Sequence, residues 1–298
     1  MVSLRQLEYL VTVVDTGSFT RAAEQLYVTQ PALSHQMRAL EQTVGGPLLE
    51  RLPRAVRLTP MGRAMLPHAR AALADAERAR CAARQAGGLI AGELLVATVY
   101  SVSLGVLPPA LRVWRRERPE VDVRLFEYRH GTEMREAMTA GEADVAIGPV
   151  PEGWDGPVRE LGTEEFVVVL PTDSTGSTGN ASEQSADGTV DLATLADCAW
   201  VHYAPGHGLA ELVDQVCADA GFRPRPAVRT EQTAAAPILA AAGLGPALVP
   251  ANVLPPRFEG RVLRPSTPVR RRLAAYTRPG PDPLTSGFVD VLAEHATV

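Results

Sequence analysis

The chain has 298 residues and a formal net charge of −5; 46% of the residues are hydrophobic and 21% are charged. This composition is typical of a soluble globular protein with two or three folding units, and it excludes a disordered chain and a disulfide scaffold. The three cysteines form no CxxC pair and have no His cluster beside them, which argues against a zinc site. We therefore expect neither a metal nor any other cofactor.

The first ten residues, MVSLRQLEYL, lack the layout of a signal peptide, since Glu8 interrupts the apolar stretch. Residues 233–256 carry no charge, but five prolines and two glycines would break a membrane-spanning helix there. A short buried helix followed by a strand is predicted instead. The sequence therefore predicts a cytoplasmic protein without a membrane partner.

Charge is divided unevenly along the chain. Residues 1–88 contain 11 Arg and seven acidic residues, a net charge of +4, whereas residues 89–298 contain 18 Arg and 27 acidic residues, a net charge of −9. A basic segment suits nucleic-acid phosphates, and an acidic segment repels them. The two parts are expected to have different partners.

Three short helices are predicted at the N-terminus. Apolar residues with helical spacing run from Leu4 to Val14 and stop at Asp15-Thr16-Gly17. Ser18 can cap a second helix at about 19–26, and Thr29 can cap a third, whose first turn tolerates a proline. The apolar stripe of the third helix is Leu33, Met37, Leu40 and Val44, and the residues predicted to face outward are Gln30, Ser34, His35, Arg38 and Gln42.

A hairpin and a long helix are predicted next. Two short β-capable runs flank Pro53-Arg54 and predict a basic wing that carries Arg51, Arg54 and Arg57. Residues 60–85 predict one helix of about 25 residues, or roughly 38 Å. Small apolar residues recur along it at spacings of four and three, which lets two helices approach closely and predicts dimerisation. These residues are Met65, Ala69, Ala72, Ala76, Ala79 and Ala83.

Beyond a hinge at Gly87-Gly88, strand-like apolar runs alternate with helical ones, an order that predicts an open α/β sheet. One set extends from ELLVATVY to DVAIGPV, and a second extends from EFVVVLP to PALVP. Two such lobes with crossing strands would leave a cleft between them. The stretch 172–189, rich in Ser, Thr and Gly, is predicted to be a surface loop.

The N-terminal run LRQLEYLVTVVDTGSFTRAAEQLYVTQPALSHQMRALEQTVG resembles the DNA-binding head of LysR-type regulators, most specifically in SFTRAAEQL, TQPALS and RALE. Weaker similarity continues through GELLVATVYSVSLGVLPPAL, GEADVAIGP and AAGLGPALVP. The resemblance implies an α/β protein with a winged helix-turn-helix at 1–58, a linker or dimerisation helix and hinge at 59–88, and an effector-binding domain at 89–298. That domain is expected to be two-lobed and similar to periplasmic binding proteins, with lobe 1 at about 89–163 plus 267–298 and lobe 2 at about 164–266.

The function implied by the resemblance is that of a sequence-specific transcriptional regulator, not an enzyme. It is expected to work as a homo-oligomer, a dimer or a tetramer, the latter being usual in the family. Its expected partners are double-stranded promoter DNA and a small-molecule effector, for which an anion is one candidate. RNA polymerase is a further candidate partner.

Candidate DNA contacts follow from the helix-turn-helix, which places the first turn of its recognition helix in the major groove. Thr29, Gln30 and Pro31 are therefore expected at base edges, where Gln can pair with adenine, and His35 and Arg38 follow one turn later. A solvated helix face, or an arginine paired with Glu50, is the alternative. The residues expected at phosphates or the minor groove are Ser18, Thr20, Ser34, Arg51, Arg54 and Arg57.

Candidate effector contacts lie at strand ends. Ser101 and Ser103 precede a helix, where a hydroxyl and free backbone N–H groups can hold a carboxylate or another anion, or can simply cap the helix. Gly148 either lets a ligand approach the backbone or serves a turn. The second lobe offers residues that could equally be structural: His202, Tyr203, His207, Thr230, Glu231 and Thr233. Without a GxSxG nucleophile elbow, no catalytic residue is expected.

Two alternatives stay open at the level of sequence. Cys198 and Cys217 would suit a thiol redox-sensing regulator of the same family, although both positions favour buried, inert thiols. The α/β half alone would suit a solute-binding module, and the DNA-binding head counts against that interpretation.

Overall fold

The computed structural model describes residues 1–52, 55–86, 92–171, 188–296 and 298. Its contacts divide the chain into two units, one of Met1–Glu93 with Glu136–Ala143 and one of Leu94–Arg135 with Asp144–Val298. The predicted hinge glycines Gly87 and Gly88, and nearly all of the predicted loop at 172–189, lie outside the described residues.

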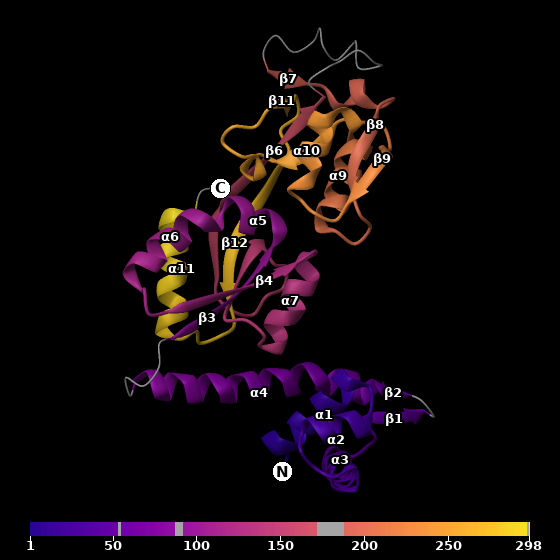
Figure 1. The fold of residues 1–298 in the computed structure, drawn as a ribbon, viewed down its shortest axis with the longest axis vertical. Coiled ribbons are helices and arrows are strands. Elements are labelled where there is room, and N and C mark those ends of the chain that lie inside the picture. Colours follow the sequence, from indigo (N-terminus) through magenta and orange to yellow (C-terminus); the bar gives the residue numbers. More distant parts are fainter. Residues whose placement is uncertain (53–54, 87–91, 172–187, 297) are drawn as a thin grey trace. The chain divides into compact units, whose positions relative to one another are not determined.

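The first unit contains three short helices and a hairpin (Figure 1). Ser18 and Thr29 cap the second and third helices as predicted, since their hydroxyls accept the backbone N–H groups of Arg21 and Ala32. The predicted apolar stripe is confirmed where Leu33, Met37 and Leu40 are buried in the core of the unit. The elements are α1 (Leu4–Thr16), α2 (Phe19–Gln25), α3 (Gln30–Val44) and the antiparallel strands β1 (Leu49–Leu52) and β2 (Ala55–Leu58).

One orientation predicted for α3 is wrong. Ser34 was expected to face outward, but it is only 4% exposed, and its hydroxyl accepts a hydrogen bond from Nε2 of Gln30 at 3.0 Å. The helical period places Ser34 beside the apolar stripe, and a small side chain satisfied by its own helix can be buried there at little cost. Gln30, His35 and Arg38 are exposed as predicted.

The long helix is confirmed as α4 (Pro60–Ala86), with 27 residues. Its apolar stripe is divided between two roles. Ala69 is buried in the core of its own unit, and Met65 and Ala72 pack against the same core. Further along the helix, Ala79 and Ala83 are exposed. The later alanines are therefore the ones available to a second helix.

In the second unit, a first lobe is built on three strands of a mixed sheet (Figure 1). Trp114 and Phe288 hold two of its helices together, with ring centroids 5.2 Å apart in an edge-to-face contact. The elements are β3 (Glu93–Val99), α5 (Tyr100–Gly105), α6 (Leu107–Glu117), β4 (Asp122–Tyr128), α7 (Gly131–Ala140), β5 (Val145–Pro149) and α11 (Pro283–His295). The division by contacts assigns the first residue of β3 and the second half of α7, from Glu136, to the first unit.

The second lobe surrounds a core that includes the fully buried Trp200 and Cys217. The charge-free stretch 233–256 forms a short helix followed by a strand, as predicted. The elements are β7 (Thr189–Val190), η1 (Leu192–Leu195), β8 (Ala199–Tyr203), α9 (Gly208–Asp219), β9 (Arg225–Thr230), α10 (Ala235–Leu239), η2 (Ala240–Leu244), β10 (Ala247–Pro250), η3 (Ala251–Val253) and β11 (Arg261–Pro265).

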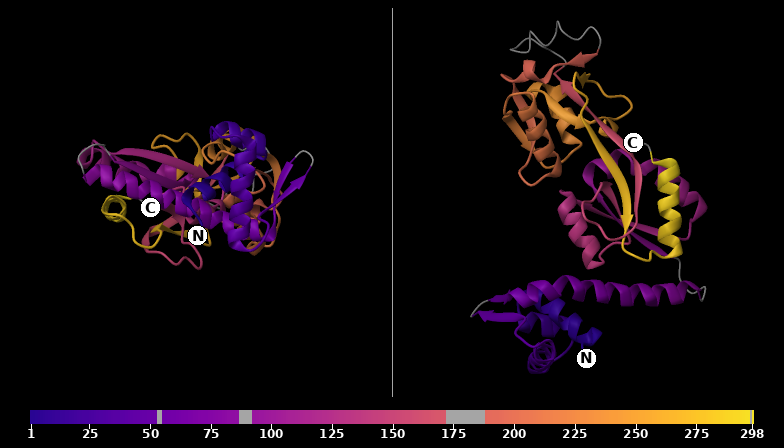
Figure 2. Two further views of the ribbon diagram at one scale, coloured as in Figure 1. Left: turned by 90° about the horizontal axis from the view of Figure 1, so that it is seen from below. Right: turned by 180° about the vertical axis from the view of Figure 1, so that it is seen from behind.

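Two long antiparallel strands, β6 (Val158–Leu170) and β12 (Arg270–Thr277), connect the lobes (Figure 2). β12 pairs with β5 in the first lobe, while β6 pairs with β10 and β11 in the second. The sheet order is β4-β3-β5-β12-β6-β11-β7, with β10 also on β6. The sequence predicted crossing strands but located only the end of β6, and it assigned no strand to 270–277. This omission matters because Glu164 and Arg271 lie directly opposite each other on these strands.

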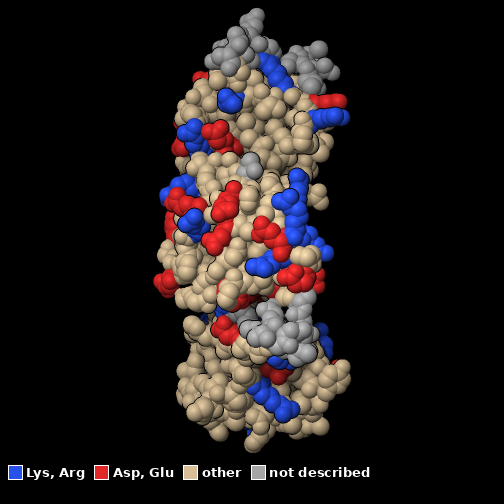
Figure 3. All heavy atoms as spheres, turned by 90° about the vertical axis from the view of Figure 1, so that its left-hand side faces the viewer, with Lys and Arg blue, Asp and Glu red and all other residues tan. Residues whose placement is uncertain are grey.

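Charged side chains are interspersed on the face of the second unit in Figure 3. Red and blue atoms alternate there, and the described residues form no extended patch of one sign on that face. The net charge of −9 from residue 89 onward is thus not gathered into one patch on this face.

Candidate functional site

The exposed surface of α3 is the first candidate site. Thr29 has extended backbone angles and ends the turn after α2, so that the first turn of α3 begins at Gln30. The Gln30 amide bonds within its own helix to Ser34, and Nε of Arg38 donates to the Ser34 carbonyl at 3.3 Å. These contacts leave an amide oxygen, an imidazole and a guanidinium on one exposed surface. Such groups can meet base edges and phosphates.

The hairpin supplies part of the predicted basic group. Arg57 is exposed on β2, opposite Glu50 in the strand register. Within the described ranges Arg57 makes no ion pair with Glu50, so its charge is available to another partner. Arg51 lies on β1, and Arg54 falls outside the described residues. Ser18 is half-buried as a helix cap, and Thr20 is exposed.

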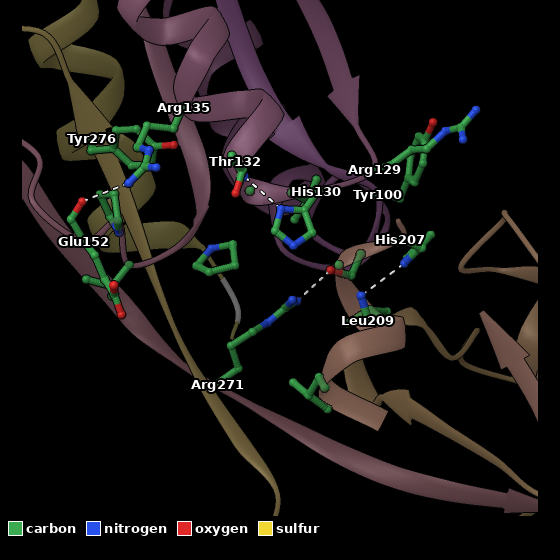
Figure 4. Close-up of a pocket in the computed structure, with 18 residues that line it drawn as sticks. Tyr100, Arg129, His130, Thr132, Arg135, Glu152, His207, Leu209, Arg271 and Tyr276 are labelled. Carbon is green, nitrogen blue, oxygen red and sulfur yellow. Dashed lines mark hydrogen bonds between the residues drawn. The ribbon is translucent and has the colours of Figure 1, made fainter. Parts of the chain in front are cut away.

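A cavity of about 390 Å³ in the second unit is the second candidate site (Figure 4). It lies where residues of both lobes and of β12 meet. The lining residues are Val99, Tyr100, Ser101, Arg129, His130, Gly131, Thr132, Arg135, Pro149, Val150, Pro151, Glu152, His207, Gly208, Leu209, Leu212, Arg271 and Tyr276.

Arg271 is fixed by a buried ion pair. The Glu164 side chain is 0% exposed, and its carboxylate accepts Nε of Arg271 at 2.9 Å and Nη2 at 2.5 Å. Nη2 also donates to the Ser101 hydroxyl at 2.9 Å, and the Asn252 amide donates to the second Glu164 oxygen at 3.0 Å. Polar groups from α5 and β6 therefore bind the guanidinium on β12, and η3 binds the Glu164 carboxylate.

Further positive charge surrounds the cavity. Arg129 lies 3.5 Å from Glu231, and Arg135 donates to the Glu152 backbone carbonyl at 3.1 Å. α7 and α9, of 10 and 12 residues, both begin at the cavity and direct the positive ends of their dipoles toward it. Of the lining residues, three are arginines and Glu152 is the acidic one. The cavity therefore suits an anion.

His207 forms one wall of the cavity. Its ring stacks on Tyr203 with centroids 4.7 Å apart, and Nδ1 accepts the Leu209 N–H at 3.1 Å, which caps α9. Burial lowers the pKa of His207 to about 4, and the charges of Arg271, Arg129 and His130 add to the shift, while Glu231 opposes it. The imidazole is thus neutral near pH 7. The direction of the shift fits a cavity dominated by positive charge.

The structure distributes the predicted effector residues over several places. Ser101 and His207 line the cavity, and Tyr203 lies against His207. The Thr233 hydroxyl is 3.3 Å from Nε2 of His207, and Glu231 faces Arg129. These five residues are brought together.

The other predicted effector residues do not line the cavity. Ser103 bonds to the Tyr100 carbonyl and to Glu127, and Thr230 closes a turn with Gln232. His202 is buried, with Nδ1 3.2 Å from Nη1 of Arg229 and Nε2 3.1 Å from the Asp214 carboxylate. Gly148 leaves room for Met134, since a Cβ at this position would lie 2.6 Å from the Met134 methyl carbon.

Sequence reasoning missed the cationic lining. Arg129 and His130 directly precede α7, Arg135 lies within it, and Arg271 lies in the run Arg270-Arg271-Arg272. A signal for Arg271 was present, because alternate residues of a strand face opposite sides. The Arg270 and Arg272 side chains are 59% and 65% exposed, whereas Arg271 is 14% exposed. Recognising 270–277 as a strand would have identified the inward arginine.

Comparison with known proteins identifies both units. Residues 4–63 match "Bacterial regulatory helix-turn-helix protein, lysR family", and residues 87–297 match "LysR substrate binding domain". The chain belongs to the LysR family of transcriptional regulators. The predicted winged helix-turn-helix and two-lobed effector-binding domain are thereby confirmed.

Individual LysR-family relatives cover most of the chain. The transcriptional regulator IlvR of Caulobacter vibrioides is 33% identical over 260 residues, 85% of this chain and 83% of the relative. ClcR of Pseudomonas putida is 31% identical over 85% of this chain and 84% of the relative. The crystal structure of CbnR, a LysR family transcriptional regulator, is 27% identical and superimposes with a TM-score of 0.72 over 100% of both chains.

A full-length OxyR variant from Pseudomonas aeruginosa is also similar, with 25% identity and a TM-score of 0.70 over 99% of this chain and 94% of the OxyR chain. The two thiols that the structure describes in this LysR-family chain are nevertheless poorly suited to redox sensing. Cys198 and Cys217 are buried, and burial raises the pKa of both, that of Cys217 to about 12. Because the thiolate is the reactive form, both residues are in an unreactive state.

Of the helices in the described ranges, none combines the length and apolar character that a membrane span needs. The same part of the chain contains no group of three or more His, Cys, Asp and Glu placed to hold a metal ion. The candidate sites of this regulator are therefore the α3 surface and the cationic cavity.

Proposed function

We propose that this LysR-family regulator binds promoter DNA in the cytoplasm through the first turn of α3 and the β1–β2 hairpin. The observation that carries the proposal is the α3 surface, on which Gln30, His35 and Arg38 are exposed beside a capped helix start. A crystal structure of CbnR complexed with its target DNA is 28% identical and superimposes with a TM-score of 0.68 over 98% of this chain and 99% of the CbnR chain.

Gln30 is assigned the role of base recognition. A carboxamide can donate to and accept from adenine in the major groove, and a good bidentate pair contributes about 1–3 kcal/mol of discrimination. In the free protein its amide donates to Ser34. The amide has two N–H groups, so one can keep the bond to Ser34 and hold the side chain while the other donates to the base. Arg57, on the hairpin, is assigned to a phosphate.

The test is a fluorescence anisotropy titration on the DNA upstream of the gene and on scrambled DNA, at fixed physiological salt. We expect Gln30→Ala to lose about 1–3 kcal/mol of binding to the upstream DNA and little to scrambled DNA. Arg57→Ala should weaken both about equally. Gln42→Ala, exposed three turns further along α3, is the control and should change neither. Equal losses for Gln30→Ala on both DNAs would refute the assignment of base recognition.

We further propose that a small-molecule effector binds the cationic cavity and that a homo-oligomer, formed through α4, acts with RNA polymerase at the promoter. The cavity volume falls within the range of small-ligand sites, and both lobes contribute to its lining. A ligand that contacts both lobes can shift their relative positions, and the shift changes DNA binding only through differential affinity for the two states. A DNase footprint that is unchanged by every ligand that raises the melting temperature would contradict this coupling.

A further inference from the structure

The guanidinium of Arg271 is only partly used by the protein. Nε and Nη2 are bonded to Glu164 and Ser101, whereas Nη1 forms no hydrogen bond with any described residue and is not enclosed. A guanidinium offers five N–H donors in a rigid plane, so a held Arg with one free nitrogen presents its remaining donors in a fixed direction.

Ser101 provides a second unused donor beside it. The hydroxyl accepts Nη2 of Arg271 at 2.9 Å, which leaves its own proton without an acceptor among the described residues. Ser101 is 2% exposed and lines the cavity. Two donors, one charged and one neutral, therefore lie side by side and match the two oxygens of a carboxylate.

Much of the remaining lining is apolar or positively charged, and Glu152 is the one acidic residue among the described lining residues. Val99, Pro149, Leu209 and Leu212 provide apolar surface, while Arg129 and Arg135 add positive charge. A ligand that fits has a small apolar body and one anionic end. Glu164 stands behind Arg271 and already balances one positive charge, so a singly charged anion fits this position better than a doubly charged phosphate.

From this geometry we infer that Arg271, together with Ser101, selects a monocarboxylate as the effector, and that Glu164 is a positioning residue that holds the guanidinium. The inference rests on the proposed effector cavity. Glu164 has two opposing effects on the binding of a carboxylate by Arg271. Its hydrogen bonds orient Arg271, and its negative charge weakens the attraction of the guanidinium for a second carboxylate.

The chain provides matched controls on the same two strands. Arg272 and Glu160 form an ion pair at 2.9 Å, also between β12 and β6, but their side chains are 65% and 61% exposed. Arg272→Gln and Glu160→Gln therefore make the same chemical changes as Arg271→Gln and Glu164→Gln, away from the cavity. Arg271→Lys keeps the charge and removes the planar fork.

The experiment is isothermal titration calorimetry of the full chain with butyrate and benzoate, each compared with its primary amide, and with inorganic phosphate. Tryptophan fluorescence melting shows that each variant is folded. We expect each carboxylate that binds to do so at least roughly tenfold more tightly than its amide, as a charge-assisted hydrogen bond predicts. Arg271→Gln should remove this preference, Arg271→Lys should retain part of it, and Arg272→Gln should leave it intact.

Glu164→Gln separates the two effects of Glu164, because it keeps a hydrogen-bond acceptor for Arg271 and removes the negative charge. The glutamine can still accept from Arg271, but the competing negative charge is gone, so carboxylate affinity should rise several-fold while amide affinity stays unchanged. Glu160→Gln should change neither. If Glu164→Gln lowers carboxylate and amide binding together, the role assigned to Glu164 is wrong.

The remaining outcomes separate this inference from the proposed function. Equal binding of carboxylates and amides to the wild type would refute charge selection and leave the effector cavity standing. Binding of phosphate that depends on Arg271, without binding of either carboxylate, would refute the ligand class. If no probe bound the folded wild type, both the inference and the assignment of the cavity would be overturned.

Discussion

At the scale of single residues, His207 lines the cavity and is held there by three neighbouring residues of the second lobe. The ring contacts Tyr203 by stacking, the Leu209 N–H through Nδ1, and the Thr233 hydroxyl near Nε2. Nδ1 accepts a hydrogen bond and must be unprotonated, so this arrangement requires the neutral imidazole. The pKa of His207 is lowered first by burial and then by the neighbouring cations. The lowered pKa keeps the imidazole neutral, which is the form that the hydrogen bond to Nδ1 requires.

The stability of the second unit should therefore fall in mild acid. The folded-state pKa of about 4 lies below the ordinary value of 6.5, so between these values the unfolded chain binds the proton preferentially. The contribution is fully present above about pH 6.5 and is lost as the pH falls toward 4. Between pH 7 and pH 5 we expect a loss of about 2 kcal/mol from this group, at about 1.4 kcal/mol per pH unit.

Urea denaturation followed by tryptophan fluorescence measures the free energy of unfolding at each pH and so checks the predicted loss. All three tryptophans, Trp114, Trp154 and Trp200, belong to the second unit, so the signal reports on that unit. His207→Asn removes the titrating group and keeps a side chain that can cap α9. The wild type should lose about 2 kcal/mol more than this variant between pH 7 and pH 5. Equal losses in the two proteins would show that His207 does not titrate as described.

At the scale of elements, the connection from η2 to β10 depends on two glycines of different kinds. Gly243 has a φ of +95°, and a Cβ added there would contact nothing within 4 Å. Gly245 has a φ of +122°, and a Cβ there would lie 1.7 Å from the Ala199 carbonyl oxygen. The first glycine is required by conformation alone. The second is also required by the close approach of the chain to β8.

Alanine substitutions should separate these two requirements. Gly243→Ala should cost about 1–2 kcal/mol, the ordinary penalty for a side chain in a left-handed conformation. Gly245→Ala adds a clash with a backbone carbonyl and should cost roughly 3 kcal/mol or more. Both are measured as the free energy of unfolding by the same fluorescence assay. A Gly245→Ala variant as stable as Gly243→Ala would mean that β8 can move aside.

At the scale of the whole molecule, α4 divides its apolar surface between folding and the proposed assembly. Ala69 is buried against the core of its own unit, whereas Ala79 and Ala83 are exposed. Exposed small residues four apart on a helix of 27 residues permit close approach of a second copy. The proposed oligomer therefore depends on the later part of α4.

Charge placed on this later part should dissociate the oligomer. In Ala79→Glu with Ala83→Glu, like charges would face each other across the helix pair, at a cost of several kcal/mol. Sedimentation velocity should show a smaller species, and DNA affinity should fall because two heads no longer bind together. Arg80→Ala, which removes a surface partner of Glu77, is the control and should leave the assembly unchanged. An unchanged oligomer in the double variant would locate the interface elsewhere.

The sequence by itself determined the features that depend on neighbouring residues. Ser18 and Thr29 could be assigned as caps because capping is decided within a few residues. The stripe of Leu33, Met37 and Leu40 followed from the helical period, and the helix and strand in 233–256 followed from the prolines and glycines that interrupt this uncharged run. The family resemblance rested on the same local runs.

The tertiary structure alone decided which polar residues line the cavity. His202 and His207 are five residues apart and looked equivalent, yet the fold encloses one with Arg229 and Asp214 and places the other in the cavity wall. Glu164 and Arg271 are 107 residues apart, and their contact exists because β6 and β12 pair in one register. No local pattern encodes that register, since it is set by how two distant strands bury their apolar faces together.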